Sequence, residues 1–158
     1  MPRSSLFAAL LAALLTAAPA AADESAPAPE AVTFVAGFAD DLFAGMLARY
    51  GMQAPQLAAL AEVHGDEAVA PIFQSEIVRA VREHGPVWRH NLALAWTPLL
   101  TAEELRSLTL SGSASPHLEK YMGLRADAGS AMQALSGDLL QTALRDAVEG
   151  TVARFPAQ

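Results

Sequence analysis

A helix start that two residues specify together lies in the middle of this sequence, and it constrains the fold more than any other feature. Thr101 belongs to the residue types that cap helix N-termini, and Glu104 follows three positions later, where its carboxylate can accept a hydrogen bond from the Thr101 amide. Pro98 disfavours helix at the residue before it, so an incoming helix should end near Trp96. The pattern predicts two helices joined by a tight corner.

Apolar residues recur at helical spacing along most of the chain, and no useful length alternates with the period of two that marks a strand. The predicted helices cover residues 30–50, 55–64, 66–83, 87–96, 102–110 and 116–154. We expect the His-Gly-Pro triplet at 84–86 to separate the third helix from the fourth. Ser115 should cap the last helix and Pro116 should open it, with a bend between residues 124 and 130. The expected fold is all-α, a single compact multi-helix bundle.

The first predicted helix carries two neighbouring apolar lines. One line holds Val35, Phe38, Leu42 and Met46, and the other holds Ala39, Phe43 and Leu47. A stripe of this width is typical of a helix that packs into a core. The pair Phe38 and Phe43 could instead line a ligand pocket, and we favour core packing.

The N-terminus has the layout of a secretory signal peptide. Arg3 precedes an apolar run over residues 6–18, and three alanines end at Ala22. We expect residues 1–22 to be cleaved, residues 23–30 to form a flexible spacer and residues 31–155 to form the helical domain. An uncleaved anchor is the alternative, but the run is shorter than the roughly 20 residues that a span needs. The sequence therefore predicts a periplasmic or secreted protein with no stable membrane span after cleavage.

The predicted mature chain is acidic. The whole chain has a formal net charge of −7, which becomes −8 when Arg3 is removed with the signal peptide. This balance disfavours nucleic acid and anionic membrane surfaces as partners. The chain has no cysteine, so disulfides and thiolate chemistry are excluded.

No pattern of catalytic, cofactor-binding or metal-ligating residues stands out. The histidines are not at zinc-binding spacing: His64, His84, His90 and His117. Glu103 and Glu104 diverge by about 100° on a helix, so their carboxylates cannot share a target. The serine-rich segment 111–115 lacks the nucleophile elbow of a serine hydrolase. We therefore assign no catalytic residue, no metal ligand and no cofactor, although a site assembled from distant residues stays open.

Short motifs around the corner resemble those of a known family: Trp96, the run 101–106, Ser115, Pro116 and Lys120. They resemble the bacterial domain of unknown function (DUF) 2059 family over about residues 86–148. The resemblance implies export and a helical fold, and it brings no established reaction or ligand. The chain departs from the family pattern where Ser111 and Gly112 stand in place of Phe-Tyr, and where Leu118 replaces a glycine.

Two classes of function are open. We favour a non-catalytic exported binding module, whose partner would be an envelope protein or an apolar ligand held in a groove between helices. The candidate groove or contact residues are Trp88, Trp96, Tyr121 and Met122. The alternative is an envelope-associated hydrolase or modifying enzyme with a dispersed site.

We expect the contact surface near the corner at 96–101 and the loop 111–116. Loss of the two family aromatics would open space beside Tyr121 and Met122, where an apolar group could insert. Equally, Ser115 and Pro116 could merely start a helix, with Tyr121 in the core.

Overall fold

The computed structural model describes residues 26–155. Within that range the chain forms α-helices and no strand. The helices are α1 (Pro29–Ala36), α2 (Ala39–Gly51), α3 (Pro55–His64), α4 (Asp66–Trp96), α5 (Ala102–Ser111) and α6 (Leu118–Val152), with a short 3₁₀ turn, η1 (Gly112–Ala114), after α5. The all-α prediction is confirmed for these residues. The predicted signal peptide, residues 1–22, lies outside the described range.

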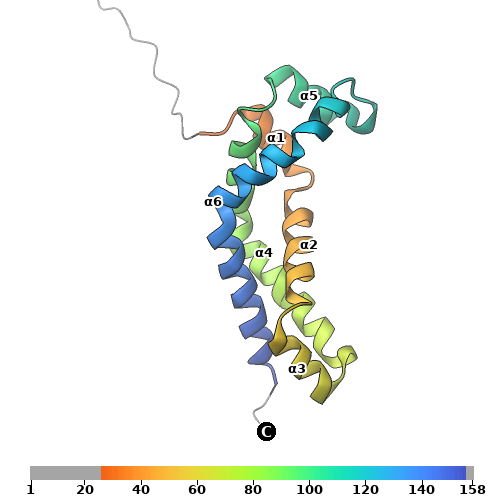
Figure 1. Ribbon diagram of the computed structural model, residues 1–158, viewed down its shortest axis with the longest axis vertical. Coiled ribbons are helices and arrows are strands. Elements are labelled where there is room, and N and C mark those ends of the chain that lie inside the picture. Colours follow the sequence, from red (N-terminus) through yellow and green to blue (C-terminus); the bar gives the residue numbers. More distant parts are fainter. Residues whose placement is uncertain (1–25, 156–158) are drawn as a thin grey trace, which may run out of the picture.

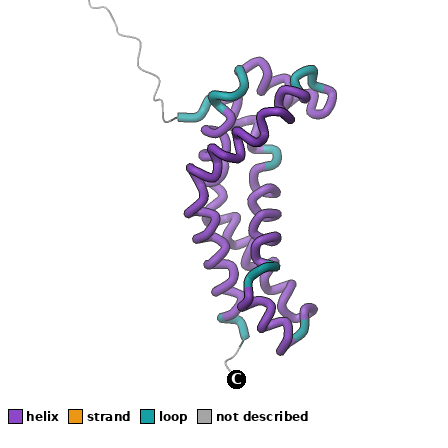
Figure 2. The backbone as a smooth tube through the Cα atoms, viewed as in Figure 1, coloured by secondary structure: helices purple, strands orange, loops and turns teal. Residues whose placement is uncertain are grey.

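The two longest helices, α4 and α6, pack against each other and form the main part of the bundle (Figure 1). They run antiparallel, since Glu76 near the start of α4 meets Arg154 just beyond α6, and Asn91 near the end of α4 meets Ser136. Helix α2 packs against both. Figure 2 shows α1, α5 and the first turns of α6 gathered at one end of this assembly, with α3 at the other end.

One apolar core runs through the bundle, and every long helix contributes to it. Its largest side chains with almost no solvent contact are Phe43, Leu47, Ile77, Leu105 and Val35. Burying a side chain of this size stabilises a fold by about 1.5–3 kcal/mol, so the apolar lines found in the sequence account for most of the driving force.

The helix predicted over residues 30–50 is two helices. The chain bends by 56° between α1 and α2, at Gly37 and Phe38. Glycine is a weak helix former, and the bend lets α1 pack on α5 and α4 while α2 packs on α4 and α6. Helix α1 also begins at Pro29, so the last two residues of the predicted spacer belong to the fold.

The predicted break at residues 84–86 is absent, because α4 continues through Pro86 to Trp96. An internal proline removes a backbone hydrogen bond and costs about 3 kcal/mol or more in isolation. Residues on both sides of it share one buried face: Ile77, Ala80, Trp88 and Leu92. Packing of this continuous face outweighs the proline, so the helix does not end there.

The His-Gly-Pro triplet instead joins α4 to its neighbours. His84 Nε2 lies 3.1 Å from Asp146 Oδ2 on α6. Gly85 is buried, and a Cβ added there would come within 3.3 Å of Asp40 Oδ1 on α2. Arg89, one turn further along, donates to both oxygens of that carboxylate at 2.7 Å. Gly85 thus leaves room for the Asp40 carboxylate of α2, which a larger residue would press against.

The predicted start of α5 is confirmed. Thr101 Oγ1 accepts from the Glu104 amide at 3.3 Å, and the Thr101 amide donates to Glu104 Oε2 at 2.8 Å. The predicted start of α6 is wrong by two residues, since the helix begins at Leu118 with His117 at its cap. Ser115 is buried and accepts from the His117 amide at 3.2 Å, which fixes the turn before the helix rather than the helix itself.

The last helix has no break, and the bend that we expected in it is a gradual curve. Helix α6 is unbroken to Val152, and Figure 1 shows its first turns leaning toward α5. Taken one at a time, the helices of residues 26–155 are too short or too polar to cross a membrane. Helices α1 and α2 together reach the required length and composition, but only as a bent pair.

Candidate binding groove

A groove of about 590 Å³ is lined by residues of α2, α4 and α6. Its apolar lining comes from Phe38, Leu42, Met46, Trp88, Leu92, Trp96, Tyr121, Ala128, Met132 and Leu140. Its other lining residues are Asp41, Arg125, Gly129, Gln133, Ser136 and Gly137. The volume is in the range of natural small-molecule sites, which are also mostly apolar with a few polar groups.

The α2 wall comes from one of the two apolar lines of the first predicted helix. Phe38, Leu42 and Met46 line the groove, and Leu42 is 43% exposed. The neighbouring line, with Phe43 and Leu47, is fully buried. Core packing is therefore confirmed for the second line and for Val35, while Phe38 and Met46 pack against the core and also line the groove, and Leu42 is largely exposed. The two lines diverge because α2 presents one face to the core and the adjacent face to the groove.

Aromatic rings close one end of the groove. Trp96 and Tyr121 stack with their centroids 4.8 Å apart, and Phe34 of α1 meets both rings edge-on. Edge-on and offset-stacked pairs are the geometries that aromatic quadrupoles favour. Tyr121 therefore packs against aromatic rings of both α1 and α4.

Trp88 lines the groove from α4, and its ring stacks on the buried Phe43 at 4.6 Å. The indole is 3% exposed, and its Nε1–H has no hydrogen-bond partner among residues 26–155. The α4 side of the groove is therefore formed by a buried ring that packs on the core.

The α6 wall includes several small residues, namely Ala128, Gly129, Ser136 and Gly137. A Cβ added at Gly129 would meet no heavy atom within 4 Å, so this glycine leaves open space in the wall. Ser136 is buried, and its hydroxyl accepts from Asn91 Nδ2 at 2.9 Å. The groove therefore exists because α6 has no large side chain at these positions.

Two charged side chains line the groove on opposite walls, Asp41 on α2 and Arg125 on α6. Asp41 lies in the first turn of α2, where the helix N-terminus stabilises a carboxylate. Arg125 lies inside α6, and its contact within the described residues is a long one, from Nη1 to Met122 Sδ at 3.9 Å.

The structure brings together three of the four groove residues predicted from the sequence. Trp88, Trp96 and Tyr121 line one groove, whereas Met122 does not line it and is 50% exposed. The groove extends from Tyr121 toward Leu140 and does not include the loop 111–116. The sequence signal for the missed part was the line Phe38, Leu42 and Met46.

The corner at Thr101 carries a charge cluster of its own. Lys120 Nζ, from the first turn of α6, lies 2.8 and 2.9 Å from the two Glu104 carboxylate oxygens. The hydrogen bond from Lys120, followed by the one from the Thr101 amide, lowers the pKa of Glu104 from 4.5 to about 2. Glu104 therefore joins α5 to α6 in addition to capping α5.

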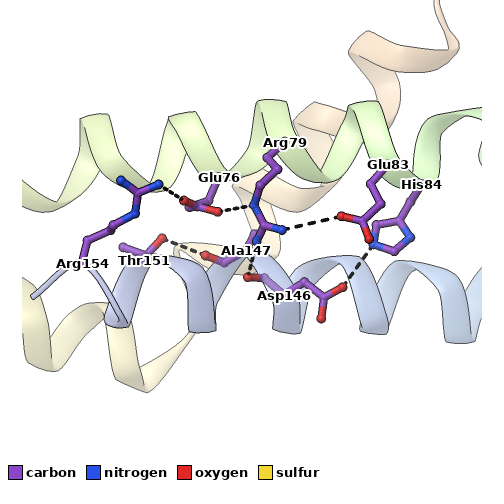
Figure 3. Close-up of polar contacts among 8 residues, drawn as sticks. All are labelled: Glu76, Arg79, Glu83, His84, Asp146, Ala147, Thr151 and Arg154. Carbon is purple, nitrogen blue, oxygen red and sulfur yellow. Dashed lines mark hydrogen bonds and ion pairs between the residues drawn. The ribbon is translucent and has the colours of Figure 1, made fainter.

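A second polar cluster lies between α4 and the end of α6 (Figure 3). The Glu76 carboxylate is almost fully buried and accepts from Arg79 Nε at 2.6 Å and from Arg154 Nη2 at 3.3 Å. Arg79 also donates to the Asp146 carbonyl at 3.2 Å. The hydrogen bond from Arg79 to Glu76 raises the pKa of that guanidinium above its already high value. These bonds satisfy the buried carboxylate.

Within residues 26–155, no three histidine or acidic side chains converge as metal ligands would. His84 is held by Asp146, and His117 lies 4.0 Å from Glu104. His64 packs against Phe155. The histidines are thus dispersed over the bundle, and the groove lining contains none of them.

Comparison of the chain with protein-family models, with curated proteins and with solved structures found no match.

Proposed function

We propose that this protein is a non-catalytic binding module that holds an apolar ligand in the groove between α2, α4 and α6. The observation that carries the proposal is the groove itself, about 590 Å³ of space with aromatic and aliphatic walls, in which Trp88 stacks on the buried Phe43. An apolar ligand in such a site would remove both its own surface and the exposed Leu42 from water.

The polar groups of the groove support binding rather than reaction. Hydrolytic chemistry needs a nucleophile or an acid–base pair whose side chains converge on one atom. The groove has a single carboxylate, Asp41, and the buried Ser136 hydroxyl is bonded to Asn91. Among the residues that line the groove, no side chain that could act as a base lies beside Ser136.

Export is the second part of the proposal. The N-terminal layout around Arg3 supports secretion, and the resemblance to the DUF2059 family supports the same location. We infer that the protein meets its ligand in the periplasm or outside the cell, as an apolar compound or as an apolar group of an envelope protein.

The test uses the two tryptophans of the chain, Trp88 and Trp96, because both line the groove. Titration of the purified protein with the neutral fluorophore N-phenyl-1-naphthylamine should quench tryptophan emission and increase probe emission, with saturation at one site. Gly129→Leu should fill the α6 wall and weaken binding on the order of tenfold, as overpacking of a fitted site does.

Gly123→Leu is the matched control, because it lies on the same helix, has the same open space at its Cβ and does not line the groove. Equal probe binding by both variants would remove the groove from the proposal. Turnover of an envelope extract that is lost in Ser136→Ala would favour the enzyme instead.

A further inference from the structure

We infer that the ligand is a single-chain amphiphile with a carboxylate head, its acyl chain along the groove and its carboxylate at Arg125. The inference rests on the proposed function and narrows it to one chemical class. Three features carry it, namely the shape of the lining, the placement of its charges and the aromatic end.

The α6 wall of the groove is long. Helix α6 contributes residues from Tyr121 to Leu140, which is roughly 28 Å of helix axis at 1.5 Å per residue. Beyond Tyr121, the side chains along this wall are small or flexible, with Ala128, Gly129 and Gly137 among the small ones. A flexible linear chain can follow such a path and remain in contact with it, whereas a compact ring system would use only part of it.

Arg125 is the one basic side chain among the groove residues. Arg79, Arg89 and Arg154 each have a carboxylate oxygen within 4.0 Å, and so does Lys120. Arg125 has no such partner within residues 26–155, and its guanidinium donates there to the weak acceptor Met122 Sδ at 3.9 Å. A planar fork of N–H donors suits a carboxylate, which can accept two of them.

Asp41, the negatively charged side chain of the groove, already has a role within its own helix. Asp41 stands in the first turn of α2, where the helix dipole favours a negative side chain, and the neighbouring Asp40 is bonded to Arg89. Neither Asp41 nor Arg125 has an ion-pair partner within residues 26–155, but the helix N-terminus partly balances the charge of Asp41, whereas Arg125 lies inside α6, away from both helix ends. This favours an anionic head over a cationic one.

The position of Arg125 matches an amphiphile. It lies one turn from Tyr121, near the aromatic end, while the apolar residues Met46, Met132 and Leu140 lie further along the groove. An acyl chain that extends away from Arg125 would contact these side chains, and methionine adapts readily to irregular apolar surfaces.

The test compares dodecanoate, dodecan-1-ol and dodecylamine, each below its micelle concentration, by tryptophan quenching and calorimetry. We expect affinity to rise roughly fourfold per added methylene from octanoate to dodecanoate. The ratio of carboxylate to alcohol affinity should fall about two- to fivefold in Arg125→Gln, as expected for a solvent-exposed ion pair. Arg125→Lys should keep most of this ratio, and high salt should reduce it in the wild-type protein.

Arg82→Gln is the matched control, since Arg82 is an exposed arginine that does not line the groove. If the alcohol or the amine binds and Arg125→Gln leaves the carboxylate-to-alcohol ratio unchanged, the inference is overturned while the proposed function stands. If none of the three ligands binds and the neutral fluorophore does not bind either, both fail. A dimer that Gly129→Leu converts to a monomer would assign the groove to a second copy and overturn the inference.

Discussion

Gly150 lies directly against the carboxylate of Glu76, so that a Cβ at Gly150 would stand 2.5 Å from Glu76 Oε2 and 3.0 Å from Arg79 Nη2. The glycine of α6 therefore makes room for a buried charged side chain of α4. Because Glu76 is held by Arg79 and Arg154, it cannot move aside without losing hydrogen bonds to charged donors.

We expect Gly150→Ala to destabilise the protein by about 1–2 kcal/mol. Alanine gains up to about 1 kcal/mol of helix propensity, but displacing a hydrogen-bonded carboxylate costs about 1.5–3 kcal/mol. Gly123→Ala is the control, because the space at its Cβ is open, and it should stabilise by up to about 1 kcal/mol. Urea denaturation of both variants checks the pair, and the same sign for both would show that Gly150 has no special role.

The two arginines at Glu76 should contribute unequally. Arg79 Nε lies 2.6 Å from Glu76 Oε2, whereas Arg154 Nη2 lies 3.3 Å from Oε1 and its side chain is 66% exposed. Arg79→Met should therefore cost about 2–3 kcal/mol, because it leaves a buried carboxylate without its closest donor. Arg154→Met should cost less than about 1 kcal/mol. Chemical denaturation of the two variants would contradict this reading if Arg154→Met proved the more damaging change.

Stability should depend on Glu104 between pH 4.5 and 2. The folded-state pKa of Glu104, about 2, lies below its ordinary value of 4.5, so the ionised carboxylate favours the folded protein. Its contribution is fully present above about pH 4.5 and is lost as the pH falls through 2. The difference in thermal midpoint between wild type and Glu104→Gln should therefore shrink over this interval. Glu103→Gln, an exposed neighbour in the same helix turn, should show no such convergence.

Pro86→Ala should stabilise the protein. The proline is exposed, so its removal loses little packing, and alanine restores the backbone donor that α4 lacks at this point. We expect a gain of about 1–2 kcal/mol, because the relief of an internal proline exceeds the 0.4–1 kcal/mol by which proline restricts the unfolded chain. If thermal denaturation shows a loss of stability in Pro86→Ala, the prediction is wrong and the helix geometry that Pro86 imposes stabilises the fold.

Local sequence patterns determined the elements of this fold. The capping box at Thr101 and Glu104 fixed the start of α5 because both partners lie within one helical turn, and such contacts do not depend on the rest of the chain. Residues 55–64 formed α3 within the predicted bounds for the same reason, with Pro55 at its start and Gly65 after its end. The aromatic candidates Trp88, Trp96 and Tyr121 could be named from their residue types alone.

Tertiary packing decided what local rules could not. Residues 84–86 predict a helix break, yet α4 is continuous through them. The apolar side chains on both sides of Pro86, Trp88 among them, are buried on one face, and their long-range contacts outweigh one missing hydrogen bond. The chain bends at Gly37 because α1 and α2 pack against different neighbours. The groove depends on which line of α2 faces α6, and helical periodicity identifies an apolar face without saying what will cover it.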